Sequence, residues 1–170
     1  MAQTLNDFMG AFQGGLRPNK FRVNHPIPGT AVGTDLLTFH IRAASMPAST
    51  MTTINVPYRG RIFKMPGIRT YQTWQITVLD DANKIYEAYH TWSDSIKSHV
   101  NNTTSDTAFD FENLMVDIEV VQLDYNGNDF RTKTIKKAWP NNIGPLTLDM
   151  ENNDTILTFT VDLEYQWFQV

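Results

Sequence analysis

The chain has 170 residues, the size of one ordinary domain, and its 41% apolar content is enough to build a hydrophobic core. Its formal charge of −4, without a dense Lys and Arg cluster, lacks the electrostatic footprint of proteins that hold nucleic acid tightly. No Cys is present, which excludes disulfides and thiolate metal sites, and the chain has neither a secretory signal nor an apolar run near the roughly 20 residues of a membrane span, so a cytoplasmic chain that does not cross a membrane is predicted.

The N-terminal segment, residues 1–19, is predicted to contain a short helix over 4–12. Its apolar residues recur at helical spacing: Leu5, Phe8, Met9 and Phe12. Thr4 and Asp7 form a capping pattern at the start, and Gly14-Gly15 ends the helix. The helix either packs on its own domain or docks on a neighbouring subunit through Leu5, Phe8 and Phe12.

Alternating polar and apolar residues predict three strands in the next part of the chain, at 20–25, 37–42 and 50–56. The first two are separated by a loop rich in Pro and Gly, and Met46-Pro47 ends the second. Neither face of the third strand is strongly apolar. Such a strand fits a sheet whose second face meets water or another subunit.

A short basic stretch follows, with Arg59, Arg61 and Lys64 between Pro57 and Pro66. It is predicted to be a loop or an edge strand. Its cations either reach acidic groups on a neighbouring subunit, as an inter-subunit contact, or guard an exposed sheet edge together with the prolines.

Residues 74–78 are predicted to form a strand, and the segment 81–99 the main helix. Asp80-Asp81 precedes the helix as a cap. The helix carries a single apolar stripe at Ile85, Tyr89, Trp92 and Ile96. One long helix among strands must cover a sheet. The tract 101–110, rich in Asn, Thr and Ser, reads as an exposed loop.

The C-terminal third is predicted to be strands joined by turns. The strand 114–123 slips in its alternation at Val120-Val121, which indicates a bulge before Leu123, and Asn126-Gly127 makes a hairpin turn into 130–138. Pro140, Gly144 and Pro145 indicate a long connection. The segment 155–170 is a long strand whose apolar face comprises Leu157, Phe159, Val161, Leu163, Tyr165 and Trp167. A strand of this length is expected to extend beyond its own domain.

These elements predict a mostly β fold over residues 1–170 as a single domain. Two antiparallel sheets pack as a β-sandwich or barrel, with one flanking α-helix. Subdivision is not indicated, because the chain has no internal repeat or linker.

The sequence contains no recognisable catalytic, metal or cofactor motif, and we expect neither an enzyme nor a cofactor. Four His are scattered without ligand spacing, and Asp124, Asn126 and Asn128 fit the hairpin turn better than a calcium loop. A glycosidase needs only two facing carboxylates, which Asp117, Glu119, Asp162 and Glu164 could supply. A solvated sheet face accounts for them more simply.

The residues that carry a family resemblance lie mostly between Ala43 and Asp81. In chain order they are Ala43-Ala44-Ser45-Met46-Pro47, Val56-Pro57, Arg59-Gly60-Arg61, Pro66-Gly67, Arg69, Tyr71, Trp74, Ile76-Thr77-Val78 and Asp80-Asp81. Arg17-Pro18-Asn19 comes before them, and Trp139-Pro140, Ile143-Gly144, Tyr165 and Trp167 come after. With these motifs in this order, nearly the whole chain resembles the tail tube proteins of contractile-tailed bacteriophages, which are related to type VI secretion tube proteins.

The resemblance implies a structural subunit with six copies in a ring and rings stacked into a tube for DNA ejection. Four strands of each subunit would join one continuous inner β-barrel around the lumen. The implied partners are other copies of the chain, the tail sheath, the baseplate, the tail terminator and DNA in transit without tight binding. The implied location is the virion tail, assembled in the host cytoplasm. The tract 101–110 and the N-terminal loop depart from the family pattern.

Four carboxylates are predicted to face this lumen: Asp162, Glu164, Asp117 and Glu119. The apolar row of the last strand must be buried, so the period of two places Asp162 and Glu164 on its other face. An acidic wall would repel phosphates and let DNA pass.

The sequence leaves two alternatives open. One is the tube of a type VI secretion system or of a phage-tail-like bacteriocin. The other is a small β-sandwich enzyme or carbohydrate-binding module, which would stay monomeric in solution.

Overall fold

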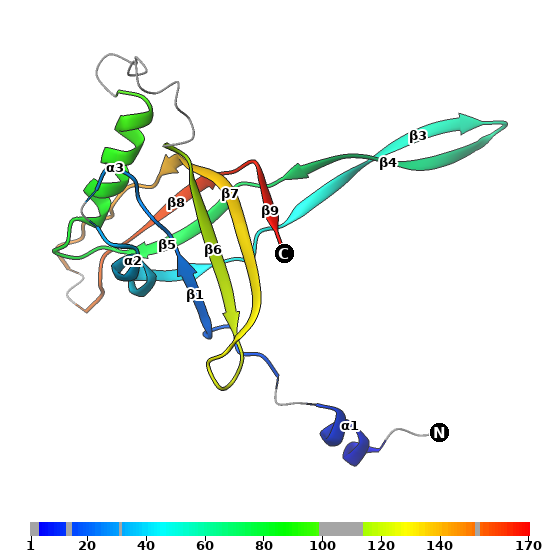
Figure 1. The fold of residues 1–170 in the computed structure, drawn as a ribbon, viewed down its shortest axis with the longest axis horizontal. Helices are drawn as coiled ribbons and strands as arrows, with labels where there is room; N and C mark the ends of the chain where they lie inside the picture. Colours follow the sequence, from blue (N-terminus) through cyan, green and yellow to red (C-terminus); the bar gives the residue numbers. More distant parts are fainter. Residues whose placement is uncertain (1–3, 13–14, 31, 99–113, 152–153) are drawn as a thin grey trace.

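A computed structural model describes residues 4–12, 15–30, 32–98, 114–151 and 154–170. Its main body is a seven-stranded antiparallel sheet in the order β1-β6-β7-β8-β5-β2, with β9 paired to β7 (Figure 1). The strands are β1 Phe21–Asn24, β2 Ile41–Ala44, β5 Trp74–Leu79, β6 Val116–Leu123, β7 Asp129–Ile143, β8 Thr158–Glu164 and β9 Trp167–Gln169. Two further strands, β3 and β4, pair only with each other.

The long strand β7 divides the sheet into two halves, because its first part pairs with β6 and its last part with β8. Lys137 has a positive φ of 56° at the crossing point, and the register shifts again between Pro140 and Asn142. Bulges of this kind bend a strand, and they also accommodate a proline that cannot donate to the ladder. The predicted two-sheet, mostly β fold is confirmed. The predicted connection at 140–145 is wrong in its first part, since the strand continues to Ile143.

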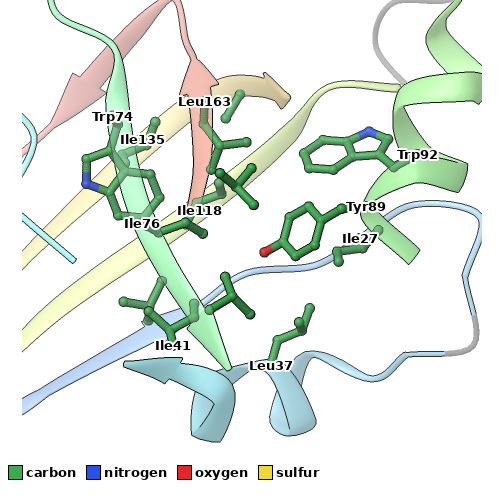
Figure 2. Packing of buried hydrophobic residues seen from close by; sticks show 14 of the residues in the cluster. Ile27, Leu37, Ile41, Trp74, Ile76, Tyr89, Trp92, Ile118, Ile135 and Leu163 are labelled. Atoms are coloured by element: carbon green, nitrogen blue, oxygen red, sulfur yellow. The ribbon is translucent and has the colours of Figure 1, made fainter. Parts of the chain in front are cut away.

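Helix α3, Ile85–Ile96, covers the core that the two halves enclose (Figures 1 and 2). Its predicted stripe is confirmed, because Ile85, Tyr89 and Trp92 are fully buried against the sheet. Side chains of both halves complete the core, including Trp74, Ile76, Ile118, Ile135 and Leu163. The expected cap is present in part: Lys84 is the N-cap, but Asp80 Oδ1 accepts a hydrogen bond from the Tyr86 amide of the first turn at 3.4 Å. Asp81 accepts one from the Asn83 amide at 2.8 Å in the turn before the helix.

A strand predicted over 37–42 proved to be a helix followed by a strand. Helix α2 runs from Thr34 to His40 and β2 begins at Ile41. Thr38 Oγ1 donates a hydrogen bond to the carbonyl of Val23, at 3.1 Å, and so fastens the helix to the end of β1. The buried residues of the segment are Leu37 and Ile41. A spacing of four residues puts both on one side of a helix as well as on one face of a strand, so it does not distinguish the two.

The strands β3, Ser49–Tyr58, and β4, Arg61–Tyr71, form a hairpin that projects from the body as a two-stranded arm (Figure 1). The turn at its tip is Arg59-Gly60, with φ of 44° and 80°, the conformation that a two-residue hairpin loop needs. The predicted strand 50–56 is therefore confirmed. The basic stretch is part turn and part strand.

A bulge interrupts the arm nearer its base than its tip, where the register shifts between Met51 and Thr53. The extra residue lies in β4 next to Gly67, where a Cβ would meet Thr52 Oγ1 at 2.5 Å. Glycine is needed here because a side chain would collide with the opposite strand.

The predicted long strand over 155–170 is present as two strands, β8 and β9, with a break at Tyr165-Gln166. Both run antiparallel to β7 in one register, with Glu164 opposite Trp139 and Trp167 opposite Lys136, and the Gln166 amide bonds to the Lys136 carbonyl at 3.2 Å across the break. After the break the inward position belongs to Phe168, while Trp167 is exposed. Because β9 continues along β7 in the direction of β8, the segment pairs within its own domain and does not extend outward.

The remaining predicted elements have clear outcomes. The short helix is α1, Leu5–Ala11, with the Thr4 and Asp7 capping box formed. The hairpin turn at Asn126-Gly127 joins β6 to β7. The register does shift between Gln122 and Leu123, but the extra residue is Phe130 of β7, and Val120-Val121, where the bulge was predicted, pairs regularly. The tract 101–110 lies outside the described residues.

Candidate assembly surfaces

The arm has one apolar face that is open to solvent. Directly opposed residues of an antiparallel pair share a face, so the pairs Ile54 with Met65 and Val56 with Phe63 lie side by side, next to Tyr58 near the tip. Between 40% and 66% of the surface of each is exposed. No residue of β3 or β4 is buried. A free two-stranded hairpin is marginally stable in water, so this face needs a partner.

The arm is also basic. Residues 49–71 contain Arg59, Arg61, Lys64 and Arg69 and no Asp or Glu. Because the whole chain has 14 Lys and Arg against 18 Asp and Glu, the rest of it holds ten cations and 18 carboxylates, a formal charge of −8. At the tip, the Arg59 guanidinium lies 5.4 Å from the centre of the Tyr58 ring. The ion pairs found among the described residues join other parts of the chain.

Helix α1 is a second surface without a partner in the single chain. None of its residues is buried, and Leu5, Phe8 and Phe12 are each more than half exposed. The rings of Phe8 and Phe12 stack at 5.3 Å. The capping box is complete, with the Thr4 amide bonded to Asp7 Oδ2 at 2.9 Å, but one helix of seven residues is too short to be stable alone. The helix lies away from the sheets, so in the single chain it does not pack on its own domain, which was one of the two alternatives from the sequence (Figure 1).

The predicted lumen residues Asp162 and Glu164 lie together on the polar side of β8. Gln75 Nε2 and Asn142 Nδ2 donate to the two oxygens of Asp162, at 2.7 and 3.0 Å. Thr73 Oγ1 donates to Glu164 at 2.6 Å. The side chains between them in β8 are core residues, so this face points away from the core. Neutral donors on β5, on β7 and just before β5 hold both carboxylates in place.

Asp117 and Glu119 lie elsewhere, on β6 in the other half of the sheet. Lys136 Nζ forms an ion pair with Asp117 at 2.6 Å, and Asn24 Nδ2 donates to Glu119, also at 2.6 Å. Burial acts to raise the pKa of Asp117, but hydrogen bonds from the Lys136 side chain and the Lys137 amide outweigh it and hold the pKa below its usual range. No single sheet face presents all four predicted carboxylates.

Two features of these surfaces were missed at the level of sequence. The apolar face of the arm includes Phe63 and Met65 of β4, whereas the prediction from sequence covered the two faces of β3 only. The alternation of Arg61, Phe63 and Met65 with their neighbours could have predicted that β4 is a strand with this face. The exposed Phe39 on α2 was hidden by the incorrect strand prediction.

Comparison with known proteins decides the family. The sequence model of the family described as phage tail tube protein matches residues 16–170. The chain belongs to this family. A tail tube protein of Serratia phage KSP90 is 31% identical over 169 residues, covering 95% of this chain and 94% of the relative. Tail tube protein gp19 of Enterobacteria phage T4 is 27% identical over 172 residues, covering 97% and 99%.

Solved structures of tube proteins from contractile injection systems have the same fold as this chain. The tube-terminating cap of the anti-feeding prophage has a TM-score of 0.67 at 18% identity, with 93% of this chain and 91% of that chain covered. A sheath–tube complex of an extracellular contractile injection system, PVC, has a TM-score of 0.58 at 18% identity, with 99% of both chains covered.

Within the described ranges, no group of three His, Asp or Glu side chains is arranged to hold a metal ion. None of the helices in the described part is long and apolar enough to cross a membrane.

Proposed function

We propose that this tail tube protein assembles as hexameric rings that stack into the conduit for DNA ejection. As a member of the tail tube family it is a structural component of the virion. The observation that carries the proposed assembly is the arm, in which 23 consecutive residues, 49–71, include no buried residue and yet expose one apolar face.

The gain from covering that face is large enough to drive association. Complete burial of one large apolar side chain contributes about 1.5–3 kcal/mol, so covering the exposed half of four such side chains contributes roughly 3–6 kcal/mol per arm. A ring repeats this contact in every copy. A contact between unlike surfaces of identical subunits closes into a ring or continues as a helical filament, the two arrangements from which a tube is built.

Charge supports the same partner for the arm. Its four cations face a remainder of the chain with a formal charge of −8, so the arm of one copy is complementary to the body of another. We place Arg59, Arg61 and Lys64 in this inter-subunit contact. Arginine suits it because the guanidinium pairs with carboxylates through two parallel hydrogen bonds.

The lumen would be lined by the half-sheet β7-β8-β5-β2, which supplies four strands per subunit. Its outward face carries Asp162 and Glu164 among Thr, Gln and Asn side chains, a polar surface of negative sign. Such a wall lets DNA slide, because it offers no cations to replace the counterions of the phosphates. The lumen proposal rests on these two carboxylates and leaves out Asp117 and Glu119, which lie on the other half.

The proposed partners follow from this role. Structural neighbours include a tube-terminating cap, a baseplate and a sheath–tube complex of related injection systems. We therefore propose that the tube contacts a tail sheath along its length, a baseplate at one end and a terminator at the other.

Negative-stain microscopy and mass measurement of concentrated protein test the assembly. We expect six-fold rings and tubes. Two variants test the arm: Phe63→Lys and Ile62→Lys add the same charge at neighbouring positions with the same 63% exposure, but on opposite faces. Phe63→Lys should prevent tube formation, and Ile62→Lys should impair it far less. A stable monomer at all concentrations and salt conditions would refute the assembly, and equal effects of the two variants would refute the choice of face.

A further inference from the structure

A groove opens between the two edge strands of the main sheet. Strands β1 and β2 are the ends of the strand order, so each has an unpaired edge, and α2 lies beside both. The groove has a volume of about 640 Å³, and its lining includes Phe21, Phe39, Ile41 and Arg42. Phe39 is 79% exposed there, although Leu37 of the same helix is fully buried. An aromatic side chain held this far into solvent at the rim of an apolar groove indicates a surface that is covered in the assembly.

The chain itself contains a convex element that matches this groove. Helix α1 presents the stacked rings of Phe8 and Phe12 together with Leu5 and Met9, all exposed by more than half. The charges are complementary too. Asp7 is the one charged residue of Leu5–Ala11, whereas the groove lining has Arg42 and no carboxylate.

We propose that α1 of one subunit docks in the groove between β1 and β2 of a neighbouring copy. The inference rests on the proposed assembly and names the receptor for a segment that the single chain leaves unused. A neighbouring copy is the occupant because the single chain leaves its own α1 and its own groove apart (Figure 1). Docking buries two apolar surfaces at once and places a short helix where tertiary contacts stabilise it, since a free helix of this length does not persist. It also covers the edge of β1, which otherwise invites uncontrolled pairing.

Disulfide trapping tests the contact cleanly, because the chain has no Cys of its own. Phe8→Cys and Phe39→Cys are made on separate chains and mixed in equal parts with wild-type protein, so that the wild-type copies sustain tube growth. Under mild oxidation we expect a disulfide-linked dimer of the two variants in assembled tubes. The bond requires Cα atoms within about 7 Å, so it reports direct docking. The pair Met9→Cys and Arg42→Cys tests the same contact at the groove's charged rim.

A matched control pairs Phe8→Cys with Tyr125→Cys, which is also exposed but lies in the β6–β7 hairpin. This pair should give no dimer. Pairing Phe8→Cys with Phe63→Cys asks whether α1 docks on the arm instead, and a dimer formed there in preference would overturn the inference. A chain carrying both Phe8→Cys and Phe39→Cys should not form an internal disulfide when dilute, and doing so would mean that α1 folds back on its own groove.

The outcomes separate this inference from the proposed function. If tubes form and neither groove pair is trapped, the docking is refuted and the assembly stands. If the wild-type protein forms no rings or tubes, the assembly itself fails.

Discussion

Acid should destabilise this subunit through one buried side chain, His25, which follows β1. The imidazole is fully buried and packs edge-on against the rings of Tyr89 and Trp92, with centroids 5.6 Å away in both cases. Neither ring nitrogen has a hydrogen-bond partner of ordinary geometry, and nor does the hydroxyl of Tyr89 beside it. The Pro26 backbone acts to raise the pKa of His25, but burial outweighs it. A charged imidazole would be poorly solvated here, so burial lowers the pKa of His25 from 6.5 to about 4.

The sign and size of the effect follow from proton binding. Between pH 6.5 and about 4 the unfolded chain protonates His25 and the folded chain does not, so the free energy of unfolding decreases as the pH falls through this range. Below about pH 4 both states are protonated, and the stability that the neutral His25 contributed at higher pH has been lost in full. A pKa difference of about 2.5 corresponds to roughly 3 kcal/mol, at about 1.36 kcal/mol for each tenfold change in proton affinity.

Urea denaturation followed by Trp fluorescence measures this on unassembled subunits at pH 7, 6, 5 and 4. The variant His25→Phe keeps an aromatic ring between the same neighbours and removes the titrating group. Its urea midpoint should fall less than that of the wild type between pH 7 and 4, by roughly 1.5 M if the slope is about 2 kcal/mol per M. Because other groups titrate equally in both proteins, the difference between the two curves isolates His25.

Tyr89→Phe is the matched control from the same cluster. Burial raises the pKa of Tyr89 far above this range, so its removal should leave the acid dependence of the wild type intact. Its stability at pH 7 should be equal or higher, because an unpaired buried hydroxyl is lost. Parallel pH curves for the wild type and His25→Phe would refute the reasoning.

Two further predictions concern the assembly. Arg59→Glu combined with Arg61→Glu should abolish tube growth in microscopy while the far-ultraviolet circular dichroism stays unchanged, because both residues lie at the exposed tip of the arm. If the double variant still forms tubes at the wild-type concentration, the two arginines do not form an inter-subunit contact and only protect an exposed strand edge. Replacing Asp162 and Glu164 with Lys should make assembled tubes retain DNA at low salt and release it as salt rises. Unchanged retention would remove these carboxylates, and with them β8, from the channel wall.

The sequence was sufficient for the elements whose own residues decide them. Helix α3 has an apolar stripe that only a helix brings to one side, and α1 has both the stripe and a capping box. The turn at Asn126-Gly127 needs a positive φ, which Gly127 supplies at 88°. The family resemblance, which rests on motifs in order, was likewise available from the residues alone. These are local properties, or properties of order along the chain, and neither needs a partner element to be known.

The sequence was misleading where two conformations share one pattern. Leu37, Phe39 and Ile41 alternate as in a strand, but the choice was made by β1, whose Val23 carbonyl accepts a hydrogen bond from Thr38 of the helix. The row from Leu157 to Trp167 predicts unbroken alternation, but the alternation shifts at Tyr165-Gln166, beside the irregular Lys137 of β7, so Phe168 packs on the core and Trp167 is exposed. Tertiary pairing overrides local preference because burial and paired backbone groups outweigh the small differences in propensity.

The candidate surfaces divide along the same line. Sequence placed the basic residues Arg59, Arg61 and Lys64 in one stretch and put Asp162 and Glu164 on the polar side of β8, since both follow from spacing along a single strand. Only the tertiary structure joined Phe63 to Val56 as one apolar face, because that depends on the register of two strands. It alone separated Asp117 and Glu119 from Asp162 and Glu164, since which half of a folded sheet a strand joins is set by the crossing of β7 and not by any residue within the strand.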